Sequence, residues 1–203
     1  MNQSCPDLAE SKPIPDYPVR LGEVILIVLG AIALVGAGCV GLYLRVINYA
    51  YNPGRAEAVA KAIVDYNIPG GAEGIFGINI GSAKLALVRS LGSPPNVILF
   101  VAKNPITRDT EGVPGNLFTS DDMDQQFTVQ SRRTETKTFC GATIPITVEE
   151  GEQTFPNLDL RRPAVRYTAS LIEEDVERTT VIVANGDRRY ELIESSFSSL
   201  RCR

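Results

Sequence analysis

The stretch VILIVLGAIALVGAGCVGLYL occupies residues 24–44 and contains no charged side chain. As a helix that rises about 1.5 Å per residue, it would span roughly 30 Å, the thickness of the hydrocarbon core of a bilayer. Tyr43, Arg45 and Tyr49 stand at its C-terminal end, and such side chains favour the headgroup region of a membrane. The stretch therefore predicts one membrane-spanning helix which, with its flanks, covers residues 21–48.

Two other uses of an N-terminal apolar stretch are weaker alternatives. A cleaved signal peptide has a basic start and an apolar core of about 7–15 residues, whereas acidic residues outnumber basic ones here and the apolar run is longer. A lipoprotein anchor is suggested by the small residues before Cys39. However, position 36 is Gly where a Leu is usual, and the apolar run continues beyond the cysteine.

The orientation of the span is weakly encoded. Lys12 and Arg20 precede the apolar stretch, and Arg45, Arg55 and Lys61 follow it. The positive-inside rule places the C-terminal part in the cytoplasm by a margin of one residue. A strand-rich domain with cysteines able to pair suits an oxidising compartment instead. We weigh the second argument slightly more and expect an extracytoplasmic domain.

Composition excludes several classes of function. The chain has 20 basic and 24 acidic residues, so it lacks the positive charge that attracts nucleic acid, and we expect no nucleic-acid partner. It has no histidine, which removes the commonest general base and most zinc ligation. Its four cysteines stand singly, with no CxxC spacing. We therefore predict no catalytic residues, no metal site and no cofactor, and consider a disulfide between Cys140 and Cys202.

The polar, proline-containing residues 1–20 predict a disordered tail, and residues 52–203 predict a soluble domain. Asn52 followed by Pro53 is typical of a helix start, and this helix should end before Pro69. The glycine-rich residues 69–81 lack a GK[ST] motif, so they favour turns around a hairpin over a phosphate loop.

Alternating and continuous apolar residues predict most of the sheet. Residues 75–80 and 84–89 should form a hairpin, and the apolar run 96–102 should be the centre of the sheet, buried on both faces. Acidic residues early and arginines late in DDMDQQFTVQSRR, residues 121–133, are typical of a short helix capped by Thr119 or Ser120. Asp121, Asp122 and Asp124 belong to its first turn on this interpretation, because an EF-hand calcium loop also needs a Gly and a Glu that are missing.

The C-terminal part predicts a second set of strands and a final helix. Residues 134–139, 144–148, 165–171 and 179–184 have strand patterns, and Asn185-Gly186-Asp187 should cap a helix. Its apolar face would consist of Tyr190, Ile193, Phe197 and Leu200. Hairpin-length connections indicate an α+β fold: an N-terminal membrane helix is followed in the sequence by a mainly antiparallel sheet with packed helices.

Several of these segments together resemble a loose group of uncharacterised bacterial single-pass membrane-anchored proteins. The segments are IVDYNIPGG (63–71), PPNVILFVA (94–102), DDMDQQF (121–127) and ERTTVIVANGDRRYELIESSFSSL (177–200). The resemblance implies a topology and transfers no catalytic residue. The order of elements is similar to that of PsbP/Mog1-like folds, and a shared fold does not define a function.

Two hypotheses of function follow. The first is a non-enzymatic membrane-anchored module, an accessory or assembly factor of a membrane or envelope complex, with the bilayer and a partner helix or a second copy as contacts. Small residues spaced along the membrane helix would form that contact: Gly30, Ala33, Ala37, Gly38 and Gly41. The second is a membrane-anchored hydrolase or carbohydrate-acting enzyme with paired carboxylates. Its candidate acids are Glu149, Glu150, Glu152, Glu173, Glu174 and Asp175.

Overall fold

A computed structural model describes residues 20–106 and 126–203 of the chain. It divides the chain into two units between Leu44 and Arg45. The elements in order are α1 (Leu21–Ala50), α2 (Pro53–Lys61), β1 (Val64–Asp65), β2 (Ala72–Ile80), β3 (Ala83–Ser90), β4 (Val97–Pro105), β5 (Phe127–Phe139), β6 (Ala142–Phe155), the 3₁₀ turn η1 (Pro156–Leu158), β7 (Leu160–Glu173), β8 (Val176–Asn185), α4 (Arg189–Ser198) and β9 (Arg201–Cys202). The predicted tail falls on residues outside the described ranges, except for Arg20.

Seven strands form one sheet in the order β2-β3-β4-β8-β7-β6-β5. Every neighbouring pair in it is antiparallel, as the hairpin-length connections predicted. A second, two-stranded sheet pairs β1 with β9, so Val64 lies opposite Cys202. The α+β class expected from the sequence is therefore confirmed.

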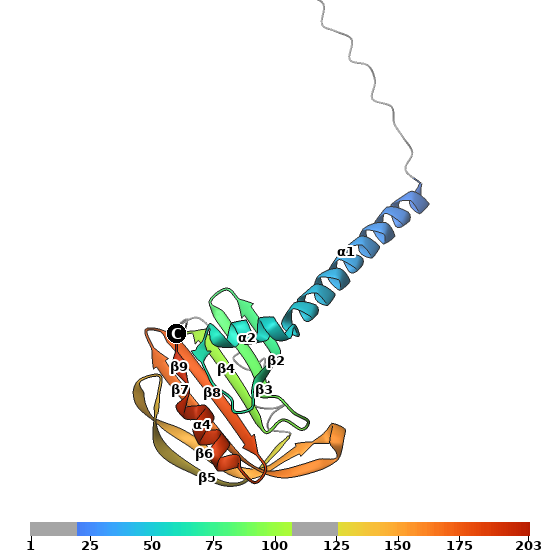
Figure 1. The fold of residues 1–203 in the computed structure, drawn as a ribbon. Coiled ribbons are helices and arrows are strands. Elements are labelled where there is room, and N and C mark those ends of the chain that lie inside the picture. The colour runs from blue at the N-terminus through green and yellow to red at the C-terminus, as the bar shows by residue number, and fades with distance from the viewer. Residues whose placement is uncertain (1–19, 107–125) are drawn as a thin grey trace, which may run out of the picture. The chain divides into compact units, whose positions relative to one another are not determined.

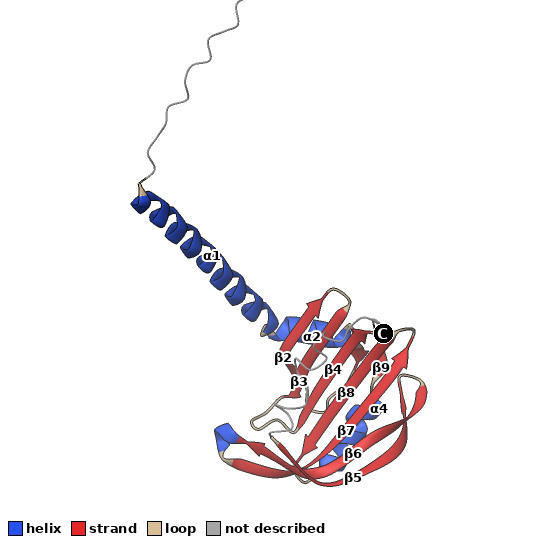
Figure 2. Ribbon diagram, turned by 180° about the vertical axis from the view of Figure 1, so that it is seen from behind, coloured by secondary structure: helices blue, strands red, loops and turns tan. Residues whose placement is uncertain are grey.

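Both short helices lie on the same face of the large sheet, α2 against β2 and β3 and α4 against β7 and β8. Figure 1 shows the two helices in front of the strands, and Figure 2 shows the strands in front of α4. The core fills the space between these layers. Its largest fully buried side chains include Ile63, Leu99, Phe139, Ile182 and Ile193.

Two glycines allow α2 to approach β2 closely. A Cβ added to Gly74 would lie 2.3 Å from the carbonyl oxygen of Pro53, and one added to Gly77 would lie 2.6 Å from the Cα of Ala56. Ala56 itself is completely buried. These glycines thus serve helix packing, whereas Gly81, with a φ of 59°, forms the turn of the predicted hairpin.

One predicted helix is wrong over the residues that the structure describes. Residues 127–133, the end of the segment predicted as a capped helix, belong to β5. Arg132 lies opposite Glu149 of β6, and Arg133 forms an ion pair with Glu150 of the same strand, so pairing with a neighbouring strand outweighs the helix-like charge pattern. The expected caps Thr119 and Ser120 and the three nearby aspartates lie outside the described residues.

Three smaller expectations are also corrected. The helix that starts at Pro53 ends at Lys61, because the chain turns into β1 well before Pro69. Residues 96–102 mostly form β4, which is next to the central strand β8, and Phe100 remains partly exposed. The last helix has no side-chain cap, and its Tyr190 is 42% exposed instead of joining Ile193 in the core.

Candidate functional site

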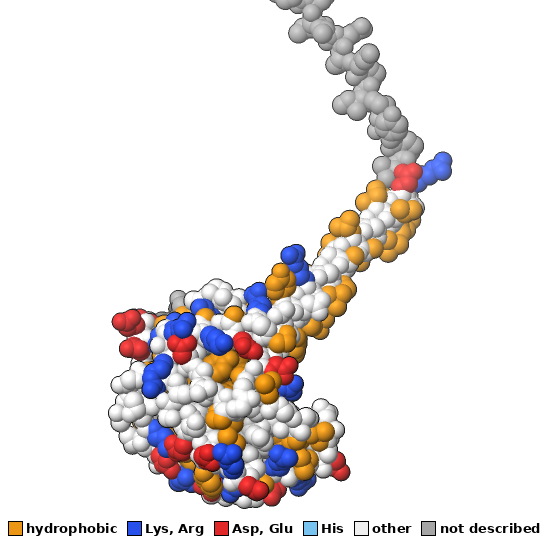
Figure 3. Space-filling model, viewed as in Figure 1, with side chains coloured by type: hydrophobic (Ala, Val, Ile, Leu, Met, Phe, Trp, Pro, Cys, Tyr) orange, Lys and Arg blue, Asp and Glu red, His pale blue; other side chains and the backbone are white. Residues whose placement is uncertain are grey.

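The first candidate surface is the apolar helix α1. In the described ranges, 20–106 and 126–203, it is one helix that is long and apolar enough to cross a membrane. Its large apolar side chains from Leu21 to Val46 are 45–80% exposed. Figure 3 shows hydrophobic and uncharged side chains along the helix, with charged side chains near its ends. An apolar surface of this kind is stable only when lipid or protein shields it from water.

The five small residues of the predicted packing face all lie within this exposed helix. A Cβ added to Gly30, Gly38 or Gly41 would meet nothing within 4 Å. Residues Ala33, Ala37 and Gly41 recur every fourth position, so their side chains follow one another along the helix. The structure thus leaves this face accessible, and a role in helix packing stays a prediction.

A second group of side chains follows directly after the apolar stretch, and we call Arg45, Tyr49 and Arg55 the juxtamembrane cluster. The guanidinium carbon of Arg45 lies 5.9 Å from the centre of the Tyr49 ring, and that of Arg55 lies 4.9 Å from it. The side chain of Asn52 accepts a hydrogen bond of 3.1 Å from the backbone N–H of Arg55, which caps α2 as predicted. Arg55 is therefore held where the chain enters α2.

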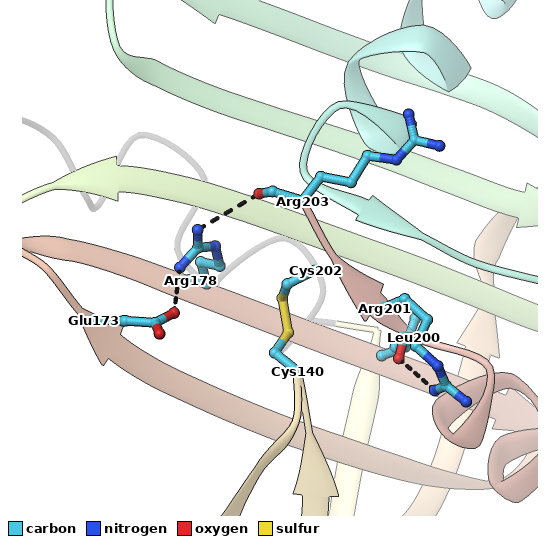
Figure 4. The surroundings of a disulfide bond; sticks show 7 residues. All are labelled: Cys140, Glu173, Arg178, Leu200, Arg201, Cys202 and Arg203. Carbon is cyan, nitrogen blue, oxygen red and sulfur yellow. Dashed lines mark hydrogen bonds and ion pairs between the residues drawn. A yellow bond between two sulfur atoms is a disulfide. The ribbon is translucent and has the colours of Figure 1, made fainter.

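A disulfide joins Cys140, at the turn between β5 and β6, to Cys202 in β9, with 5.0 Å between the Cα atoms. Figure 4 shows the bond between two cysteines that lie 62 positions apart in the sequence. Nearby, Arg178 pairs with the carboxylate of Glu173 at 3.2 Å and donates to the backbone oxygen of Arg203 at 3.5 Å. The bond attaches β9 to the turn between β5 and β6, and the β1–β9 pairing attaches it to the start of the domain.

A cavity of about 460 Å³ lies beside the disulfide, between the end of β5 and α4. At its wall the carboxylate of Glu194 accepts hydrogen bonds from Lys137 and from the hydroxyl of Tyr167, the latter at 2.6 Å. Burial opposes ionisation of Glu194, but the bonds from Lys137 and Tyr167 prevail and lower its pKa. Burial, followed by the bond to Glu194, raises the pKa of Tyr167. The carboxylate is therefore charged at neutral pH and already has two donors.

An ion cluster around the buried Glu149 lies midway along β5, β6 and β7. Glu149 of β6 is 2% exposed and accepts hydrogen bonds from Arg132 of β5, at 2.7 Å, and from Arg166 of β7, at 2.5 Å. Arg166 is 7% exposed and lies 4.8 Å from the ring centre of Phe127. The three charged residues are direct neighbours across adjacent strands. This pairing can be predicted from the sequence only when the register of the strands is known.

The other candidate acids of the enzyme hypothesis do not join Glu149. Glu150 pairs with Arg133, whose hydrogen bond lowers the pKa of Glu150. Glu173 pairs with Arg178, and Glu174 lies exposed in the turn before β8. Over residues 20–106 and 126–203, no group of three or more His, Cys, Asp or Glu side chains is placed to hold a metal ion. Glu73, Glu149, Glu150 and Glu173 form cross-strand pairs with arginine.

No family model matches the chain, and no curated protein matches it. Among solved structures, it is similar to LpqN of Mycobacterium tuberculosis, a protein involved in cell envelope biogenesis. The match has 10% sequence identity and a TM-score of 0.35, and it covers 72% of this chain and 95% of LpqN. At this level, the likeness carries no conclusion about what this chain does.

Proposed function

We propose that the chain is a single-pass, membrane-anchored module that acts by binding, as an accessory or assembly factor of a membrane or envelope complex. The observation that carries the proposal is α1, thirty residues long, with its large apolar side chains exposed from Leu21 to Val46. A helix of this length and composition is stable when lipid surrounds it. The sheet domain is then held at the surface of the membrane.

The polar groups of the sheet domain support binding over catalysis. A catalytic acid or base needs a free position for substrate, and catalytic carboxylates work in pairs whose pKa values are pushed apart. Glu149, Glu150, Glu173 and Glu194 each accept hydrogen bonds or ion pairs from Arg or Lys side chains. Such pairs fix strands and helices to one another, as in a rigid scaffold for a partner.

The disulfide supports an extracytoplasmic position for the sheet domain. Bonds of this kind form and persist in oxidising compartments and are rare in the cytosol. Cys140 and Cys202 are held 5.0 Å apart by two different elements, so they can oxidise without rearrangement of the fold. We therefore place residues 45–203 outside the cytoplasm and residues 1–20 inside.

Membrane vesicles from cells that produce the full chain test this proposal. After a carbonate wash, the chain should remain in the pellet, and protease should digest the sheet domain in intact spheroplasts but not in inverted vesicles. Recovery in the carbonate supernatant would refute the membrane anchor, and the opposite protease pattern would refute the orientation. Crosslinking in intact cells, followed by purification in mild detergent, should give defined adducts; a chain that crosslinks to nothing would contradict a role in assembly.

A further inference from the structure

Two arginines lie over the ring of one tyrosine directly after the apolar stretch, at 5.9 Å and 4.9 Å from its centre. Arg45 lies one helical turn before Tyr49 in α1, and Arg55 reaches the same ring from the first turn of α2. Tyr51 contacts Phe76 of β2 at 5.3 Å between ring centres, so the chain between the two helices is packed against the sheet. Both cations are therefore held beside the same ring, whose negative face attracts them.

These two cations lack an acidic partner within the described residues. The ion pairs found in residues 20–106 and 126–203 include Lys61 with Glu57 and Arg89 with Glu73, but none involves Arg45 or Arg55. Both arginines are exposed. A guanidinium over a ring keeps N–H donors at its edge, and two such groups offer a phosphate or carboxylate several charge-assisted hydrogen bonds.

The place of the cluster in the sequence decides which anion it meets. The apolar stretch ends at Leu44, Arg45 is the next residue, and Tyr49 lies about 7 Å further along the helix. The headgroup layer on each side of a bilayer is about 5–8 Å thick. In a chain anchored by α1, the juxtamembrane cluster thus lies at the depth of the lipid phosphates.

We propose that Arg45, Tyr49 and Arg55 form a binding site for the headgroup of an anionic phospholipid, with the two guanidinium groups on its phosphate. This inference rests on the proposed membrane anchor and adds that the anchored chain binds anionic lipids in preference to zwitterionic ones. A zwitterionic lipid carries the same phosphate, but its own cationic group offsets the attraction. Each arginine near a membrane surface adds about fivefold to the affinity for anionic lipid.

Native mass spectrometry of the full chain in detergent tests the site. The probes are dioleoylphosphatidylglycerol and dioleoylphosphatidylcholine, added in equal amounts. The wild-type chain should bind the anionic lipid at least fivefold more often. Arg45→Gln with Arg55→Gln should bring the ratio close to one, and Tyr49→Ala should lower it because both guanidinium groups lose their common support. Equal binding of the two lipids by the wild type would overturn the proposal.

A matched control separates the site from net charge. Lys61→Gln with Arg188→Gln removes the same number of positive charges, but these side chains already pair with Glu57 and Glu191. This variant should keep the wild-type lipid ratio, and an equal loss of preference in it would also overturn the site. Carbonate extraction of the same variants tests separately whether the chain remains anchored in the membrane. A chain that stays in the membrane but shows no lipid preference refutes the site alone, whereas a chain released by carbonate refutes the anchor.

Discussion

At the scale of single residues, neighbouring glutamates on β6 have opposite surroundings. Glu149 is buried between Arg132 and Arg166, whereas Glu150 forms an exposed pair with Arg133. Removing one partner from a buried ion pair costs about 3–5 kcal/mol, and removing one from an exposed pair costs about 1 kcal/mol or less. The same chemical change should therefore have very different effects at the two positions.

We expect Glu149→Gln to lower the free energy of unfolding by about 3 kcal/mol, because Arg132 and Arg166 lose the carboxylate that they share. Glu150→Gln should lower it by less than about 1 kcal/mol. Thermal unfolding of the full chain in detergent, followed by circular dichroism, measures both. Equal losses in the two variants would contradict the importance of the buried cluster.

The pH dependence of stability should show the contribution of Glu194. Its pKa in the folded chain lies below the ordinary value of 4.5, because the bonds from Lys137 and Tyr167 outweigh the opposing effect of burial. Its stabilising effect is thus complete above pH 4.5 and is lost as the pH falls through the lower, folded pKa. Glu194→Gln should lower Tm at pH 7 and have a smaller effect near pH 3. Glu174→Gln, in an exposed turn, is the control and should change Tm at neither pH.

At the scale of elements, the contact between α2 and β2 depends on missing side chains. Gly77→Ala would place a Cβ 2.6 Å from the Cα of Ala56, so either the helix or the strand must shift. Overpacking of this kind costs typically about 1–3 kcal/mol. Gly54→Ala in α2 is the matched control, since its Cβ would meet only a side-chain oxygen at 3.6 Å. Thermal unfolding should show a clear loss of stability for Gly77→Ala and little change or a gain for Gly54→Ala.

The small-residue face of α1 predicts a packing surface for another membrane helix. Ala37→Leu together with Gly41→Leu would fill that face without adding a polar group, so insertion into the membrane should persist. We expect crosslinking to a second copy or to a partner to fall in this variant. Ile32→Ala with Val35→Ala changes large side chains on the opposite side of the same helix and serves as the comparison. Unchanged crosslinking in the Ala37 and Gly41 variant would leave α1 as an anchor alone.

The sequence was informative about elements where local patterns decide the structure. Alternating residues with short turns predicted the hairpins of β2 with β3 and of β7 with β8, and these are confirmed. It failed at residues 127–133, where the order of acidic and basic residues indicates a helix. There the decisive partners, Glu149 and Glu150, lie 17 positions away. The buried cluster and the juxtamembrane cluster were missed for the same reason: both join residues from different elements.

At the scale of the whole molecule, the disulfide closes a long loop of the sheet domain. A bond across 62 positions removes enough freedom from the unfolded chain to add about 4 kcal/mol in the loop-entropy description. We expect Cys140→Ser, Cys202→Ser, or both together, to lower Tm strongly and to make Tm insensitive to reducing agents. Cys39→Ser, in the exposed helix, should change neither. A wild-type chain whose Tm is unaffected by reduction would contradict this stabilisation.

The pairing of β1 with β9 has a consequence for the time course of biosynthesis. Val64 follows α1 closely, yet its partner Cys202 lies 138 positions later. Closing contacts between distant positions is slow, because a large chain entropy must be lost before any contact is gained. On the proposed extracytoplasmic topology, β1 stays without its partner until residues 201 and 202 have crossed the membrane. Until then the domain is incomplete, and in this interval chaperones and thiol oxidases of that compartment would have access to it.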